Sequence, residues 1–269
     1  MYYAININEY RQDDIPSLKR LWTETFGDAP ELVDRFFELL PSMGTGLVAE
    51  ADGELLGAAY LLDAELWSPE KPPVKLGYIY AVAVEPSARN CGIGAKLISA
   101  CERYCWENGI EICTTLPAEE SLYAWYERVG GFQTATRCLY ETVLPSDSAA
   151  EITPLFADEY AFKRADILRD NNYVNLNYGY MLFQEALCKR YGGGLFGCKG
   201  GIACGYVDNG VLLVKEVLND SPEFIPALCS KLGAKSALVR RPDRYGTPFI
   251  AAYEAKALPR DTVWNLALD

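Results

Sequence analysis

Residues 82–98 read VAVEPSARNCGIGAKLI, and this stretch decides the fold. The residues before it, VKLGYIYA (74–81), alternate in character and predict a β-strand. Within the stretch, Arg89 stands three residues before Gly92, and Gly92 and Gly94 are spaced G-x-G ahead of a helical pattern. A turn from strand to helix needs one glycine at most. The second glycine and the arginine therefore indicate a loop that contacts a ligand.

The ligand that this loop favours is an anion. The first N–H groups of a helix have no partner inside the helix, and the helix dipole favours negative charge beside them. Gly92 and Gly94 leave the backbone open to a phosphate. A Rossmann fingerprint would need a third glycine where Leu97 stands, and a Walker A motif would need a glycine where Ala95 precedes Lys96. The pattern that fits is R-x-x-G-x-G after a strand ending in V-x-P, which predicts a pyrophosphate cradle.

Composition limits the chemistry. The chain has 269 residues, which suits two domains better than one. It contains no histidine, so a Ser-His-Asp or Cys-His hydrolase is excluded, and a general base must be a carboxylate, tyrosine, cysteine, lysine or relayed water. The nine cysteines form no C-x-x-C pair. We therefore expect reduced thiols packed as small apolar residues, and no metal site.

Charge is unevenly distributed along the chain. Residues 1–145 carry 11 basic and 22 acidic side chains, whereas residues 146–269 carry 14 and 15. The acidic half repels nucleic acid and attracts a cation such as an amine, although ordinary solubility gives the same imbalance. The sequence shows neither an apolar run of about 18 residues nor a signal peptide. We therefore expect no membrane and no nucleic acid as partners, and a cytoplasmic location.

Hydrophobic periodicity gives the order β-α-α-β-β-β-α-β-α-β for the first half of the chain. The predicted helices span residues 13–26, 30–40, 93–108 and 118–129, and the predicted strands span 2–8, 46–52, 54–66, 74–85, 110–116 and 132–144. Asp52-Gly53, between two of these strands, predicts a tight hairpin.

The second half repeats this order. Residues 144–154 (LPSDSAAEITP) contain two prolines and several small polar residues, and they mark the expected domain boundary. The elements predicted after it are a short strand near residue 151, helices around 157–169, 177–190 and 222–232, and strands 194–200, 202–209, 210–218, 235–241, 247–255 and 262–268. This order predicts an internal duplication of one fold.

Two motifs in the first half resemble the GNAT superfamily of N-acetyltransferases. The first motif agrees with the family in residue type and spacing at Val84, Pro86, Arg89, Gly92 and Gly94. The second, SLYAWYERVGGF (121–132), is similar to the family's closing helix. The resemblance covers roughly residues 1–145. It implies an α/β fold with a mixed sheet, the GNAT fold, in two tandem domains (1–145 and 146–269), and it implies acetyl-coenzyme A as the co-substrate.

The resemblance also implies roles for individual residues. Backbone groups of Val82, Ala83 and Val84 would bind the acetyl carbonyl and the pantetheine arm. The loop residues that would bind the pyrophosphate are Arg89, Asn90, Cys91, Gly92, Ile93, Gly94 and Ala95. Tyr126 would protonate the leaving thiolate. The family usually has one glycine before the phenylalanine of the second motif, whereas this chain has Gly130 and Gly131, a departure that bears on the register of Tyr126.

Attack by a neutral amine also requires a base, because a free alkylamine has a pKa of about 10.4. Glu85, at the end of the strand beside the loop, is the first candidate, and Tyr78 and Tyr80 of the same strand could act through water. Each assignment has a plainer alternative. Glu85 is alternatively a solvated loop carboxylate, and Tyr126 is alternatively a core residue, since two other aromatic residues share its helix.

The second half lacks a counterpart of the cradle. Its equivalent strand–helix junction reads VKEVLNDSPEFIPAL (214–228), with Ser221 as the expected N-cap and Pro222 at the first helical position. We therefore expect residues 146–269 to form a degenerate GNAT-like domain without a donor site, which walls the acceptor cleft. Tandem relatives of the enhanced-intracellular-survival type bring their own C-terminal carboxylate to the active site. This chain instead ends in VWNLALD at Asp269, which differs from the ending in those relatives.

The expected function is direct transfer of an acetyl group from acetyl-coenzyme A to a small cationic amine or a lysine-bearing substrate. Two alternatives stay open: an inactive acyl-coenzyme A sensor that keeps the donor site, and a transferase of another acyl group. The sequence does not name the acceptor, and it leaves a homodimer open as the oligomeric state.

Overall fold

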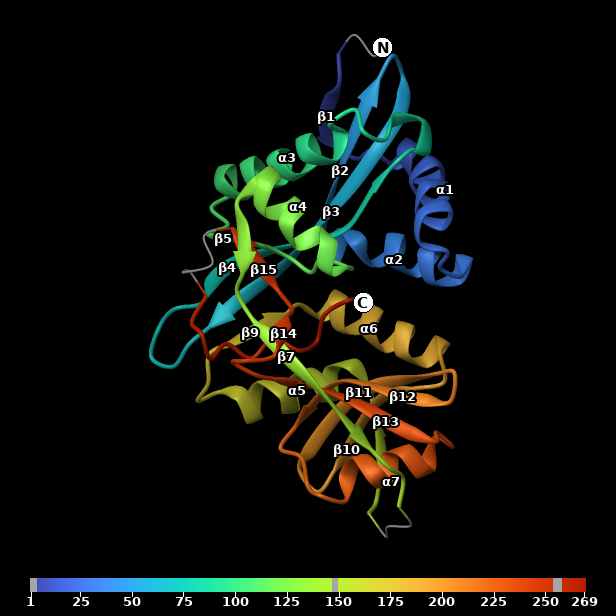
Figure 1. Cartoon of the computed structure of the whole chain (residues 1–269), viewed down its shortest axis with the longest axis vertical. Helices are drawn as coiled ribbons and strands as arrows, with labels where there is room; N and C mark the ends of the chain where they lie inside the picture. The colour runs from blue at the N-terminus through green and yellow to red at the C-terminus, as the bar shows by residue number, and fades with distance from the viewer. Residues whose placement is uncertain (1–3, 147–149, 254–257) are drawn as a thin grey trace. The chain divides into compact units, whose positions relative to one another are not determined.

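The structure, a computed structural model, describes residues 4–146, 150–253 and 258–269. These residues form two compact units. The first contains the described residues of Met1–Leu66, Pro73–Ala135 and Ile250–Leu258, and the second contains those of Trp67–Pro72, Thr136–Phe249 and Pro259–Asp269. Each unit is built on a sheet of its own (Figure 1).

All four helices predicted for the first half are present. The helices of the first unit are α1 (Ile15–Phe26), α2 (Pro30–Met43), α3 (Ile93–Glu107) and α4 (Glu120–Gly130). Its strands are β1 (Asn6–Glu9), β2 (Gly44–Ala51), β3 (Glu54–Trp67), β4 (Val74–Val84), β5 (Ile112–Thr115), β6 (Phe132–Thr134) and β15 (Ala251–Tyr253). The strand predicted at 2–8 begins outside the described residues, and β1 covers its later part.

The strands of the first sheet lie in the order β1-β2-β3-β4-β5-β15-β6. Helices α3 and α4 cover one face, and α1 and α2 cover the other (Figure 1). Because both faces are covered, alternate residues of one strand enter different cores. Leu61 packs beneath α3, whereas its neighbour Tyr60 packs against Trp22 of α1, with ring centroids 5.4 Å apart.

The predicted hairpin between β2 and β3 is confirmed. Asp52 and Gly53 both have positive φ (53° and 82°), and the flanking Ala51 and Glu54 are paired. Two central residues with positive φ give the turn whose twist matches that of the strands it joins.

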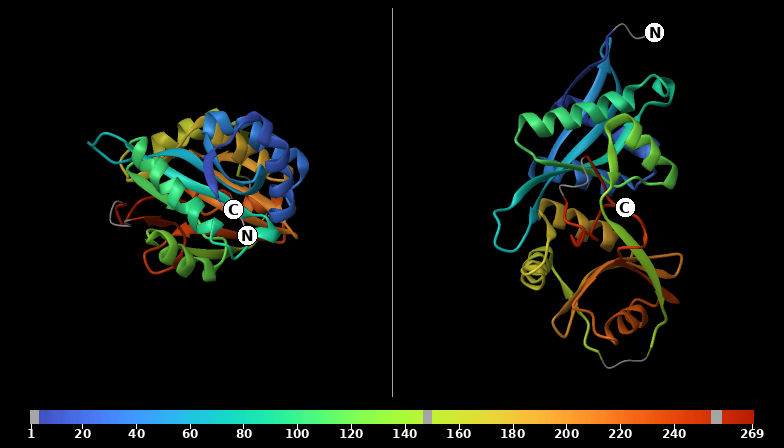
Figure 2. Two further views of the ribbon diagram at one scale, coloured as in Figure 1. Left: turned by 90° about the horizontal axis from the view of Figure 1, so that it is seen from above. Right: turned by 60° about the vertical axis from the view of Figure 1, so that its left-hand side comes forward.

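The second unit contains helices α5 (Ala157–Leu168), α6 (Tyr178–Arg190) and α7 (Phe224–Lys231). Its strands are β7 (Arg137–Val143), β8 (Thr153–Leu155), β9 (Tyr173–Leu176), β10 (Gly194–Cys198), β11 (Gly201–Asp208), β12 (Val211–Leu218), β13 (Ser236–Pro242) and β14 (Thr247–Pro248). The second sheet has the order β14-β7-β13-β12-β11-β10-β8 and curves around α7 (Figure 2). The core beneath α7 includes Phe224, Leu228 and Val214.

Each half of the sequence contributes a strand to the sheet that the other half mainly builds. β7 comes from the first half and pairs with β13 in the second sheet. β15 comes from the second half and lies between β5 and β6 in the first sheet, where Ala251 is paired with both Thr115 and Thr134. Neither sheet is therefore complete within its own half of the sequence.

The exchange corrects two sequence predictions. The strand predicted at 132–144 is two strands in different sheets, β6 and β7. The strand predicted at 247–255 is likewise divided into β14 and β15, and residues 254 and 255 lie outside the described residues. Alternation of residue character cannot show where an extended segment passes from one sheet to another.

One predicted strand and one boundary also differ from the structure. Residues 262–268, predicted as a strand, form a single bridge at Val263 and are otherwise irregular, although most of them are buried. The compact units part between Ala135 and Thr136, ten residues before the expected boundary. The assignment of 1–145 and 146–269 as functional domains stays a prediction.

The exchanged strand β15 should be essential for the stability of the first unit. We expect Ala251→Pro to lower the melting temperature by about 5 °C or more, because proline in an inner strand removes a ladder hydrogen bond. Ala251→Gly is the matched control, since it removes a methyl group but keeps the N–H. Thermal unfolding followed by circular dichroism would test this, and equal melting temperatures for the two variants would contradict it.

Candidate functional site

The site begins where β4 and β5 part. The two strands run parallel and are paired from Leu76 with Ile112 to Ile79 with Thr115. β4 continues to Val84, and there its partner is β3 on the other side. The backbone of the last residues of β4 therefore lies beyond its last pair with β5. Backbone groups released in this way are able to hydrogen-bond a ligand lying along the strand.

A β-bulge in β4 turns this released segment. Tyr80 is paired with Tyr60, and Ala83 with Ala58, so two residues of β4 oppose one residue of β3. Ala81 takes a positive φ of 48° at this point. The extra residue changes which side chains face α3, so that Val82 and Val84 pack against the core beneath that helix. The bulge was not predicted from the sequence.

The predicted cradle follows β4 directly. α3 begins at Ile93, and its first helical hydrogen bond runs from the N–H of Lys96 to the carbonyl of Gly92 at 3.1 Å. The N–H groups of Ile93, Gly94 and Ala95 precede that bond, and Gly92 has no side chain with which to cap them. Gly92 is left-handed, with φ 78°, and a Cβ added there would meet none of the described atoms within 4 Å. This helix N-terminus is suited to an anion.

The loop residues differ in exposure. Those that reach solvent are Arg89, Asn90, Cys91 and Gly92, whereas Ile93 is buried and Val82, Val84, Gly94 and Ala95 are half-buried. Ala83 is buried. The Nε of Arg89 donates to the carbonyl of Val84 at 3.1 Å, and this bond ties the guanidinium to the end of β4. The predicted donor-binding residues are thus gathered at one strand–helix junction, although their binding role is untested.

Trp125 is a residue of the site that the sequence analysis did not single out. A Cβ on Gly94 would lie 3.3 Å from Cζ2 of Trp125, so the indole ring packs directly on the glycine at the start of α3. Gly94 is therefore required at least partly for this close packing. The ring of Trp125 also meets that of Tyr126 edge to face, with centroids 4.9 Å apart. Trp125 and Gly94 lie in different helices far apart in the sequence, so no local pattern indicated this contact.

Tyr126 lies at the point where the strands part. It is 7% exposed and lies in the core beneath α3. Burial raises the pKa of Tyr126, and the side chain of Thr115, the last residue of β5, opposes part of that rise. A buried phenol that keeps its proton near neutral pH is suited to act as an acid.

Glu85 is not a free carboxylate. Its side chain forms an ion pair with Nη2 of Arg20 on α1, and Nη1 of the same guanidinium lies 3.0 Å from Glu24. Its backbone N–H donates to the carbonyl of Leu56 at 2.9 Å, which fixes the residue beside β3. A carboxylate engaged by a cation in this way would have to leave that contact before it met a substrate proton. The base role of Glu85 stays a prediction.

The two tyrosines of β4 lie on the face covered by α1 and α2. Tyr78 is 1% exposed, whereas Tyr80 is half-buried. The ring of Tyr80 lies 5.7 Å from that of Trp22 and 5.8 Å from that of Phe36. Of the two residues that could act through water, Tyr80 is therefore the one nearer to solvent.

The double glycine after α4 has a packing reason. Gly131 is left-handed, with φ 67°, and it ends the helix. A Cβ on Gly130 would collide with Oε1 of Glu102 and would lie 2.8 Å from the ring of Phe132. The first glycine makes room for a carboxyl of α3, and the second ends α4. The ring of Tyr126 packs edge to face on that of Phe132, with centroids 5.9 Å apart.

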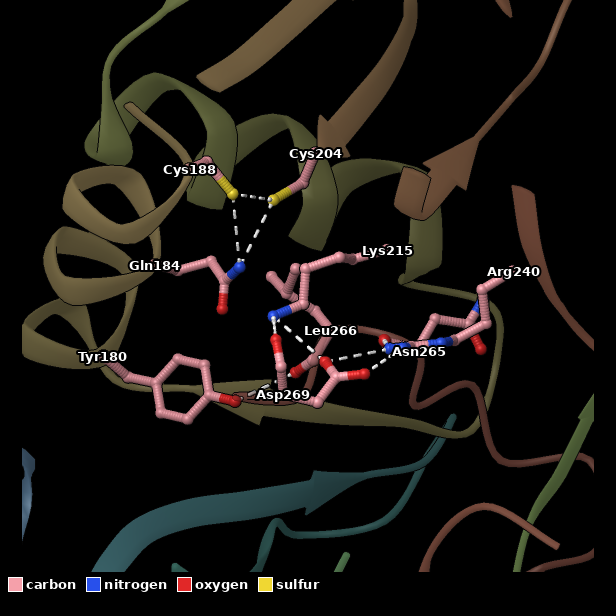
Figure 3. A network of polar contacts seen from close by, with 9 residues as sticks. All are labelled: Tyr180, Gln184, Cys188, Cys204, Lys215, Arg240, Asn265, Leu266 and Asp269. Carbon is pink, nitrogen blue, oxygen red and sulfur yellow. Dashed lines mark hydrogen bonds and ion pairs between the residues drawn. The ribbon is translucent and has the colours of Figure 1, made fainter. Parts of the chain in front are cut away.

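The carboxylate of Asp269 forms ion pairs with two cations of the second unit (Figure 3). Nζ of Lys215 lies 3.0 Å from Oδ1 of Asp269 and donates to its backbone oxygen at 3.0 Å. The guanidinium of Arg240 pairs with the same carboxylate. Burial alone would raise the pKa of Asp269, but Lys215 and Arg240 together hold it below its ordinary value.

The junction of the second unit that corresponds to the cradle is acidic. Glu223 stands at the N-cap of α7 and pairs with Lys199 at 2.6 Å, and Asp220 accepts from Arg241 at 2.8 Å. Ser221, the expected N-cap, precedes the helix by three residues. Carboxylates at this position disfavour a pyrophosphate.

Over residues 4–146, 150–253 and 258–269, no three or more Cys, Asp or Glu side chains are grouped as a metal site. In the same ranges, none of the helices is both long and apolar enough to cross a membrane.

Part of the first unit is similar to a known protein family. Residues 10–132 match the sequence model of the Acetyltransferase (GNAT) family. A search of curated proteins gave no match.

Solved structures share the fold over nearly the whole chain. A probable N-acyltransferase from Enterococcus faecalis V583 aligns with a TM-score of 0.71 and 13% identity, covering 93% of this chain and 72% of that one. A GCN5-related N-acetyltransferase from Kribbella flavida aligns with a TM-score of 0.67 and 14% identity, covering 93% of this chain and 70% of that one. Eis1 from Mycobacterium abscessus aligns with a TM-score of 0.60 and 16% identity, covering 91% of this chain and 66% of that one. At these identities the likeness establishes the fold alone.

Glu102 should make the stability of the first unit depend on pH. Burial raises its pKa to about 7 from an ordinary value of 4.5. Its neutral form therefore stabilises the fold below pH 4.5, and this contribution is lost as the pH rises through about 7. We expect the free energy of unfolding of Glu102→Gln, relative to that of the parent, to be higher at pH 8 than at pH 5. Urea unfolding at the two pH values would measure this, with Glu107→Gln on the same helix as the control. A stability difference that is the same at both pH values would contradict it.

Proposed function

Because residues 10–132 belong to the GNAT acetyltransferase family, we propose that this chain transfers an acetyl group from acetyl-coenzyme A directly to an amine. The acceptor proposed is a small cationic amine or a lysine-bearing substrate. The observation that carries the proposal is the parting of β4 from β5 immediately beside the uncapped N-terminus of α3.

The donor would span both features of this junction. Its pyrophosphate would accept from the N–H groups of Ile93, Gly94 and Ala95, with Arg89 beside them. Its pantetheine arm would lie along the released backbone of β4, from Ala81 to Val84. The thioester would then lie near Thr115 and Tyr126, where the strands begin to part. Backbone N–H groups of β4 would stabilise the oxyanion of the tetrahedral intermediate.

Acid and base would be supplied by different elements. Tyr126 would give its proton to the leaving thiolate. Its burial supports this role, and so does its position on α4 near the end of β5. The base must take a proton from the ammonium form of the acceptor, and Glu85 or a water held by Tyr80 are the candidates. The acidic composition of the first half would favour approach of a cation.

Two alternatives rest on specific features. In the structure the first candidate base, Glu85, is already paired with Arg20. This ion pair favours an acyl-coenzyme A sensor, which would bind the donor without transferring its acyl group. Transfer of another acyl group would use the same cradle, since the pyrophosphate and pantetheine are shared by all acyl-coenzyme A donors. Release of free thiol with a panel of amines and acyl donors distinguishes the three.

Coenzyme A should bind at the start of α3. We expect Gly92→Ala to weaken its binding about tenfold or more, because the new methyl group and the strained backbone disturb the amide cradle. Gly109→Ala is the matched control: Gly109 is also left-handed (φ 66°) and follows the opposite end of α3. Isothermal titration calorimetry gives both dissociation constants. Equal weakening in the two variants, or unchanged binding in both, would argue against the cradle.

Tyr126 should affect turnover rather than donor binding. We expect Tyr126→Phe to lower kcat by about tenfold or more while the dissociation constant of coenzyme A changes little, because the ring stays and only the proton donor is lost. Tyr123→Phe on the same helix is the control. Thiol release and calorimetry measure the two quantities, and full turnover in Tyr126→Phe would remove this residue from the acid role.

A further inference from the structure

The indole of Trp125 touches both ends of the path proposed for the donor. A Cβ on Gly94 would lie 3.3 Å from Cζ2 and 3.4 Å from Cη2 of this ring, so the outer edge of the indole covers the first turn of α3. The same ring meets that of Tyr126 edge to face, with centroids 4.9 Å apart. Gly94 belongs to the predicted cradle, and Tyr126 is the proposed acid. One side chain thus connects the place proposed for the pyrophosphate with the residue proposed to meet the thioester.

The end of β4 reaches the same spot. The third atom near the Cβ position of Gly94 is Cγ2 of Val84, at 3.9 Å. Val84 and Trp125 both pack against the core beneath α3. Val84 is also the last residue of the strand segment that extends beyond the β4–β5 pairing. The indole, the released strand and the start of α3 therefore meet around one glycine.

Trp125 keeps surface for a ligand after this packing. It is half-buried, whereas Tyr126, the next residue of α4, is 7% exposed. Pockets for small molecules are lined mainly by apolar and aromatic side chains, and an indole offers a large flat apolar surface. The pantetheine arm of an acyl-coenzyme A consists of methylene, methyl and amide groups, which suit such a surface.

We propose, on the basis of the function proposed above, that the indole of Trp125 binds the pantetheine arm of the donor. The arm would pass from the first turn of α3 across the indole toward Tyr126, with the released backbone of β4 beside it. Covering the ring removes apolar surface from water, which favours binding. Trp125 would thus contact the arm, whereas the cradle would contact the phosphates.

This division of contacts can be tested with a ligand that lacks the arm. 3′-Phospho-ADP is coenzyme A without pantetheine, so it would occupy the cradle without reaching the indole. Trp125→Phe keeps an aromatic ring in the core but removes the outer edge that packs on Gly94. Trp106→Phe is the matched control, because Trp106 lies at the far end of α3 and is 82% exposed.

Calorimetry on the full-length chain would compare the two ligands, with the weaker one measured by displacement. We expect Trp125→Phe to weaken coenzyme A about fivefold or more, since it loses apolar contact area, and 3′-phospho-ADP less than about twofold. Gly92→Ala should weaken both ligands, because it acts on the phosphate site that they share. Trp106→Phe should bind both as the parent does.

Tryptophan fluorescence provides a second readout. The chain has five tryptophans, so the contribution of Trp125 must be found by difference. Coenzyme A should change the emission of the parent and of Trp106→Phe. The change should be much smaller with 3′-phospho-ADP, and it should be largely lost in Trp125→Phe.

Three results would overturn the proposal. They are parental affinity for coenzyme A in Trp125→Phe, an equal weakening of both ligands in that variant, which would indicate a structural role, and a fluorescence change that persists without Trp125. Binding of neither ligand by the parent is a different failure, because it removes the donor site from the proposed function and this inference with it. Selective weakening of coenzyme A in a chain that transfers no acyl group would support the inference and contradict only the transferase activity.

Discussion

The site depends on one constraint, the ending of the β4–β5 ladder at Ile79 and Thr115 while β4 stays paired with β3. A strand held on one side only exposes backbone groups without unfolding. The bulge at Ala81 then turns the chain so that Val82 and Val84 pack beneath α3. The same packing brings the free N–H groups of α3 next to the released strand. The predicted anion cradle and the parting of β4 from β5 are thus consequences of one local geometry.

The second sheet repeats this geometry with different side chains. Its β12–β13 ladder ends at Val214 and Val239, and Lys215 is the extra residue of a bulge, as Ala81 is in the first sheet. The side chain of Lys215 is 2% exposed, and Asp269 forms ion pairs there with both Lys215 and Arg240. Buried cations require such an acidic partner. Similar backbone geometry therefore accompanies the predicted cradle in one unit and an ion cluster in the other.

The exchange of β7 and β15 links the two halves of the sequence at the level of the sheets. Ala251 is paired with Thr115, so a residue from late in the chain supports the end of β5 beside Tyr126. Late in the chain, Trp264 and Leu266 are also buried, at 1% and 0% exposure. The second half of the chain is thus part of what holds the first sheet in order.

The sequence by itself determined the elements and the loop chemistry. Alternation, helical periodicity and Asp52-Gly53 depend on neighbours in the chain, so the helices and the hairpin were predictable. The R-x-x-G-x-G pattern is equally local, and the binding role of the cradle stays a prediction. Tertiary structure alone decided the exchange of strands, the bulge at Ala81 and the ion pair of Glu85 with Arg20. The physical reason is that each of these joins residues distant in sequence, and no local pattern records which distant partner a strand or side chain will meet.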